Sequence, residues 1–154
     1  MAVSIVDGTL ESFELKRKAP AVSIYRDLII RHRDGGETRL RKAVSAAKVA
    51  DQLEVGAKGR FYLYESIDNK GIHGVRLENG ATIHAFPVMN ERVMLLVLVI
   101  NCVLLIGRIL IEGVLWYLPL ALIVLAAIVY PLYRKTHLAA RDQFQRDQQS
   151  ASAR

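Results

Sequence analysis

The stretch "VMLLVLVINCVLLIGRILIEGVLWYLPLALIVLAAIVYPLYRK", Val93 to Lys135, decides the fold class, because only Asn101, Arg108 and Glu112 interrupt its apolar character before the basic end. A helix needs about 20 apolar residues to cross the hydrocarbon core of a bilayer, and this stretch is roughly twice that long. At about 1.5 Å per residue, one straight helix would project far beyond the membrane. We therefore expect two membrane-spanning helices.

The sequence "EG" at Glu112-Gly113 is the natural point of division. Glycine suits a tight reversal and glutamate prefers water, which leaves predicted spans at residues 93–111 and 114–133. Aromatic residues mark both ends of the second span, as in membrane interfaces: Trp116, Tyr117, Tyr130 and Tyr133. A buried helical pair in a soluble core is the alternative. It is disfavoured because neither segment has the polar face of a globular helix.

Basic residues flank the predicted hairpin on one side only. Arg92 precedes it, and Arg134, Lys135 and Arg141 follow it. The positive-inside rule then places both ends in the cytoplasm. The start of the chain, "MAVSIVDGTLESFEL", lacks the basic and apolar regions of a signal peptide. We expect an integral protein of a bacterial inner (plasma) membrane with both termini cytoplasmic.

Residues 1–88 have the alternating pattern of β-strands. In the stretch 22–33, one predicted face carries Ile24, Leu28 and Ile30, and the other carries Tyr25, Asp27, Arg31 and Arg33. An extended segment that opens the chain is predicted to bend at Asp7-Gly8. Hairpin turns are predicted at Asp34-Gly35-Gly36 and at Asn79-Gly80.

Helical periodicity interrupts these strands once, near residues 45–53. The apolar positions of this stretch form one helical stripe: Ala46, Val49, Ala50 and Leu53. Ser45 is the candidate N-cap. The predicted order is three strands, a short helix, then two or three strands.

That order resembles the five-stranded OB barrel, which places its helix between the third and fourth strands. An SH3-like barrel or an unclosed sheet is the alternative. The predicted class is an α+β membrane protein in three parts. These are an OB-like cytoplasmic β-domain at 1–88, a transmembrane hairpin at 89–133, and a basic, partly disordered cytoplasmic tail at 134–154.

Two histidines are candidates for chemistry in the last hairpin. A two-residue Asn79-Gly80 loop would place His73 and His84 on one sheet face as diagonal neighbours. A metal site needs a further ligand, and the sequence offers no well-placed one. The single cysteine, Cys102, lies in the apolar stretch and forms no intrachain disulfide. We therefore predict no metal, no cofactor and no catalytic residue.

Basic residues are the candidate contacts to an anionic surface: Lys16, Arg17, Lys18, Arg31, Arg33 and Arg92. The simpler interpretation is a solvated strand face balanced by acidic residues. Asn101 is a candidate intramembrane contact, across the hairpin or to a second copy. We expect the protein to contact membrane lipids and to bind a protein partner, either another protein or a second copy of this chain. We do not expect it to bind nucleic acid.

Three functional hypotheses follow. The first is a non-enzymatic membrane-anchored adaptor whose cytoplasmic β-domain binds a protein partner. The second is a small accessory or immunity-type membrane protein that acts through its hairpin. The third is an enzyme, or a membrane-tethered domain that binds nucleic acid or anionic lipid. The sequence favours the first and does not identify the partner.

Overall fold

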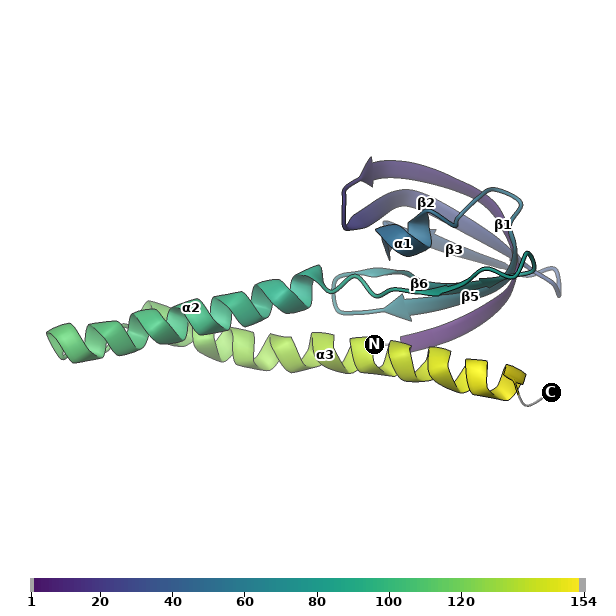
Figure 1. Cartoon of the computed structure of the whole chain (residues 1–154). Coiled ribbons are helices and arrows are strands. Elements are labelled where there is room, and N and C mark those ends of the chain that lie inside the picture. The colour runs from purple at the N-terminus through teal and green to yellow at the C-terminus, as the bar shows by residue number, and fades with distance from the viewer. Residues whose placement is uncertain (1, 153–154) are drawn as a thin grey trace. The chain divides into compact units, whose positions relative to one another are not determined.

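Strands occupy the first part of the chain and two long helices occupy the rest, in a computed structural model that describes residues 2–152 (Figure 1). The α+β chain divides into two compact units. The β-unit contains the residues up to Pro87 together with those from Thr136 onward, and the apolar unit is Val88–Lys135. The elements are β1 (Ala2–Lys18), β2 (Val22–His32), β3 (Glu37–Arg41), β4 (Val44–Ala46), α1 (Ala47–Ala50), β5 (Lys58–Glu65), β6 (Lys70–Leu77), β7 (Thr82–His84), α2 (Met89–Glu112) and α3 (Tyr117–Ser152).

The strands form one seven-stranded antiparallel sheet in the order β3-β2-β1-β5-β6-β7, with β4 paired to β2. The sheet is open, so the predicted closed OB-like barrel is wrong and the unclosed sheet is correct. An isolated parallel bridge joins Ala43, which lies between β3 and β4, to Lys70 at the start of β6. No continuous ladder closes the sheet there within the described residues. Lys42, beside this bridge, has a left-handed φ of 55° and lies between β3 and β4.

The long strand β1 pairs with two neighbouring strands, β5 along its first part and β2 along its second. Residues 2–9 pair with β5, and residues 8–18 pair with β2. Gly8 lies where both ladders meet, and a Cβ atom there would overlap the backbone carbonyl of Arg31. A glycine is needed at this close approach. The strand β1 continues through Asp7 and Gly8 without interruption, and the predicted bend there stays a prediction.

A β-bulge in β2 changes which of its side chains are buried. Glu14 pairs with Asp27 and Leu15 pairs with Tyr25, so Arg26 is an extra, unpaired residue. The extra residue reverses the alternation. Tyr25 therefore lies in the core with Leu28 and Ile30, whereas the sequence pattern predicts Ile24 on that face.

The core lies inside the curved sheet, with α1 against it. The α1 helix is shorter than predicted, but Val49 and Leu53 of the predicted stripe are buried. Ser45 does not cap the helix; its hydroxyl donates to the carbonyl of Ile72. The main core residues are Val6, Leu10, Tyr25, Leu28, Ile30, Leu40, Ala43, Val49, Leu53, Phe61, Leu63, Ile72, Val75 and Leu77.

The described residues include two helices, α2 and α3, that are long and apolar enough to cross a membrane. Gly113 ends α2 with a left-handed φ of 67°, and its N–H donates to the carbonyl of Ile109. Arg108 pairs with Glu112 and lies 4.3 Å from the ring centre of Trp116. The few polar groups at this connection are thus matched with one another.

The last part of the chain differs from the predicted tail. The tail is expected to fray soon after the second span, but α3 continues to Ser152. Thr136, Ala140 and Phe144 are buried in the β-unit. Packing of one helical face is the usual source of helix stability in proteins, so this contact accounts for the order of a Gln-rich and Ser-rich segment.

Candidate functional site

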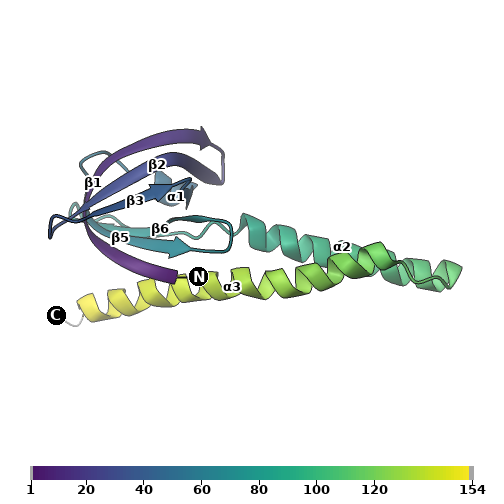
Figure 2. The same cartoon turned by 180° about the vertical axis from the view of Figure 1, so that it is seen from behind.

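The candidate site is the face of β5, β6 and β7 opposite the core, which we call the outer face. Its side chains are Arg60, Tyr62, Tyr64, His73, Arg76, His84 and Phe86. Residues 136–150 of α3, the C-terminal segment, cover it, and the end of α3 runs beside these strands in both views (Figures 1 and 2). The outer face and the C-terminal segment both belong to the β-unit.

A second β-bulge builds the outer face. On β5, Phe61 and Leu63 enter the core, so Tyr62 and Tyr64 point outward. On β6, Tyr62 pairs with Gly74 and Leu63 pairs with Ile72, which leaves His73 as the extra residue. Two successive residues of β6 then lie on the outer face, which strict alternation would forbid.

The predicted contact between the two histidines is confirmed, although the predicted register is wrong. A two-residue Asn79-Gly80 loop would pair Val75 with His84. Gly74 pairs with His84 instead, because the turn has three residues and Gly80 adopts a φ of 91°. This shift alone would place His73 and His84 on opposite faces. The bulge at His73 reverses the shift, and the ring centres lie 5.3 Å apart.

Phe144 is the apolar anchor of the C-terminal segment. Its ring centre lies 4.8 Å from that of Tyr62 and 4.9 Å from that of His84. Gly74 leaves the space for it, since a Cβ atom there would lie 3.1 Å from the Phe144 ring. Near the start of the segment, His137 stacks on Phe86 at 5.0 Å.

Asp147 is the polar anchor. Its carboxylate accepts hydrogen bonds from the Tyr62 hydroxyl and from the guanidinium of Arg60, and it also accepts one from Arg76 at 3.3 Å. Arg60 also pairs with Asp7 and holds the pKa of that carboxyl below its ordinary value. Charge-assisted hydrogen bonds of this kind are among the stronger ones in proteins, so they fix the position of the segment along the sheet.

The histidines lie in an electrostatically unusual place. His73 has an exposed fraction of 0%, and neither ring nitrogen has a hydrogen-bond partner within the described residues. Burial, followed by the nearby His84, lowers the pKa of His73 from 6.5 to about 4, although the neighbouring Gln143 acts in the opposite direction. Burial also lowers the pKa of His84, and His137 and Arg141 add to this effect. Both rings are therefore neutral at pH 7.

The same burial affects the tyrosines. It raises the pKa of Tyr62, and the hydrogen bond to Asp147 adds to that rise. It also raises the pKa of Tyr64, whose hydroxyl donates to the carbonyl of Val44. Both phenols remain protonated donors. The described residues contain no group of three or more metal-ligating side chains. What the outer face contacts is the C-terminal segment of the same chain, through Phe144 and Asp147.

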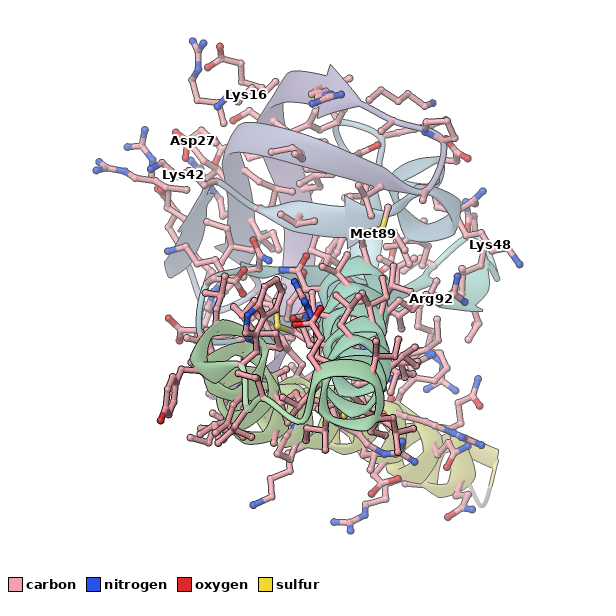
Figure 3. The ribbon with its side chains drawn as sticks, turned by 90° about the vertical axis from the view of Figure 1, so that its left-hand side faces the viewer. Lys16, Asp27, Lys42, Lys48, Met89 and Arg92 are labelled. Atoms are coloured by element: carbon pink, nitrogen blue, oxygen red, sulfur yellow. The ribbon has the colours of Figure 1, made fainter. Side chains whose placement is uncertain are left out.

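The basic residues predicted to contact an anionic surface differ in whether acidic residues already pair with them, and their contact with such a surface stays a prediction. Lys18 pairs with Asp51, Arg31 with Glu11, and Arg33 with Glu78. Lys16 and Arg17 are exposed and form no ion pair with a described residue. Arg92 belongs to the apolar unit. On the β-unit, Lys16 and Lys42 project from one side and Lys48 from the other (Figure 3).

Asn101, the predicted intramembrane contact, is satisfied inside its own helix. Its exposed fraction is 9%, and its side-chain amide donates to the carbonyl of Val97 at 2.8 Å. A contact to another helix or to a second copy stays a prediction.

The sequence reasoning missed the C-terminal segment, although the segment carries a readable signal. Its buried or anchoring residues recur at helical spacing: Thr136, Ala140, Phe144 and Asp147. Such a stripe marks an amphipathic helix. The stripe is a weak signal, because it contains a single aromatic residue and the rest of the tail has the polar composition typical of a disordered segment.

Comparison of the chain with protein-family models, curated proteins and solved structures finds no match.

Proposed function

We propose that this protein is a membrane-anchored, non-enzymatic adaptor. Its two apolar helices cross a bacterial inner membrane as a hairpin, and its β-unit binds a protein partner at the cytoplasmic surface. The observation that carries the proposal is the composition of the β-unit. Residues from both ends of the chain form it, and both apolar helices lie between them in sequence.

This composition supports a hairpin. If the apolar helices enter a bilayer, the residues before Pro87 and those after Thr136 must lie on one side of it, because they pack together. An even number of crossings satisfies that condition. The charge bias of the flanking residues independently places that side in the cytoplasm.

The surface of the apolar unit supports insertion. Large apolar side chains remain exposed along α2 and the first part of α3, including Val103, Leu110, Ile111 and Leu118. Soluble monomers rarely expose contiguous apolar patches larger than a few hundred Å². A lipid environment would satisfy these side chains.

The surface of the β-unit supports partner binding. Apolar side chains are exposed at Leu15, Val55 and Ile67. Many neighbouring charges are already paired, as with Arg31 and Glu11. A protein partner suits such a mixed surface better than a polyanion, which would have to displace those acids.

Photocrosslinking in the full-length, membrane-inserted chain tests the proposal. A photoreactive residue at Leu15 or Val55 should capture a defined partner. The same partner should be captured when residues 93–133 are replaced by an unrelated two-span hairpin. If capture is lost with that replacement, or occurs only from Val103, the hairpin itself binds the partner and the adaptor proposal fails. If alkaline extraction of membranes releases the full chain into the supernatant, the proposal that its apolar helices anchor it in the membrane is contradicted.

A further inference from the structure

The contact between the C-terminal segment and the outer face contains a fully buried histidine, His73, beside the partly buried His84. We propose that the C-terminal segment is a pH-sensitive latch, which covers the outer face at neutral pH and leaves it when His73 and His84 take up protons. The inference concerns the β-unit alone and does not rest on the proposed function.

The geometry of the closed state, in which the C-terminal segment covers the outer face, disfavours protonation of His73. The His73 ring is fully buried and its nitrogens lack hydrogen-bond partners among the described residues. One nitrogen of His84 and the side-chain oxygen of Gln143 are also buried without a partner there. An imidazolium at this position would be a buried charge without a paired anion, which is strongly disfavoured.

The groups that surround the histidine pair do not offer a compensating negative charge. Tyr62 and Tyr64 of β5 approach His73 with neutral rings, at 6.0 and 6.3 Å between centres. From α3, His137 and the guanidinium of Arg141 both act to lower the pKa of His84. The remaining elements contribute Phe86, beside His73, and Phe144, beside His84.

The carboxylate that faces this contact is Asp147, and it is already engaged. Arg60, Arg76 and the Tyr62 hydroxyl all donate to it. Its negative charge is therefore balanced by two guanidinium groups rather than offered to an imidazolium.

The direction of the pH effect follows from linkage. Release would expose His73 and return its pKa from about 4 to about 6.5. Above pH 6.5 neither state carries the proton, and closure is at full strength. As the pH falls from 6.5 toward 4, the released state binds the proton and the closed state does not, so closure weakens. With these values, His73 alone shifts the equilibrium toward release by about 30-fold between pH 7.5 and 5.0, and His84 adds to the shift.

Cysteine accessibility in the full chain measures this equilibrium. On a Cys102→Ala background in detergent, Ala140→Cys places a thiol at a fully buried position of the segment, and Gln145→Cys places one at an exposed position. The probe is 4,4′-dithiodipyridine. The ratio of the two labelling rates reports the released fraction and cancels the intrinsic pH dependence of the thiol. It should rise at least about 30-fold from pH 7.5 to 5.0.

A core position separates latch release from unfolding. Val75→Cys lies in the fully buried core of the same unit, and its relative labelling rate should not rise. If Val75→Cys and Ala140→Cys rise together, acid unfolds the whole β-unit and the latch proposal is overturned. If neither rises, it is also overturned.

Histidine variants assign the effect. His73→Phe should flatten the pH response, whereas His32→Gln should retain it, because His32 instead bonds Thr38. If His73→Phe itself opens the segment at pH 7.5, His84→Phe is the second variant. It removes one of the two titrating rings and should reduce the rise. A rise in either variant that equals the rise of the natural chain assigns the response to another group and overturns the proposal.

Discussion

Replacement of Phe144 by alanine should detach the C-terminal segment without unfolding the core. The Phe144 side chain is only 6% exposed, and it contacts the rings of Tyr62 and His84. Truncation of a buried phenylalanine typically costs about 3–5 kcal/mol. We take about 3 kcal/mol, because the segment covers one face and the vacated space can admit water. That value corresponds to a roughly 150-fold increase in the released population.

Limited proteolysis of the full chain in detergent measures this change. Trypsin sites at Arg141 and Arg146 lie within the segment, and their cleavage follows the open population when closing is fast. The Phe144→Ala variant should be cleaved there about 150-fold faster than the natural chain. Leu138→Ala is the matched control, since that apolar side chain is 44% exposed and its loss should change the rate little. Equal cleavage of the two variants would refute the assigned packing.

Three further outcomes are expected. Asp147→Asn should speed the same cleavage, because the loss of a charge-assisted acceptor costs about 1.5–3 kcal/mol; an unchanged rate would count against the polar anchor. Gly74→Val should do so as well, since its side chain takes the space of the Phe144 ring, and a normal rate would mean that the ring lies elsewhere. On a Cys102→Ala background, Gly113→Cys should react with an impermeant maleimide from outside intact cells, whereas Ser150→Cys should react only after permeabilisation; labelling of the latter in intact cells would contradict the proposed topology.

Features set by composition and length could be predicted from the sequence. The two apolar helices follow from a stretch twice the span of a bilayer, and Gly113 marks the end of α2 as expected. The second helix begins at Tyr117 rather than at residue 114. Glycine-containing turns and alternation predicted most of the strands, and these signals are local.

Features set by bulges and by sheet closure could not be predicted in this way. Nothing in the alternation of residues 22–33 reveals that Arg26 is an extra residue, yet that one residue puts Tyr25 rather than Ile24 in the core. The side-chain contact between His73 and His84 follows in the sequence-based prediction from a wrong register, which the bulge at His73 offsets. Whether the sheet closes depends on pairing between strands far apart in the sequence, which the hydrophobic pattern does not report.

The C-terminal segment divides the folding of the β-unit into two stages, one before and one after the apolar helices are made. An N-terminal domain complete in itself would finish folding before the apolar helices leave the ribosome. The core of the β-unit satisfies that description, because its residues all precede Pro87. The outer face does not, since Phe144 and Asp147 come last in the chain and cover Tyr62 only after both apolar helices have been made. If the apolar helices cross a membrane as proposed, closure of the outer face therefore requires that the chain has returned to the side on which it began.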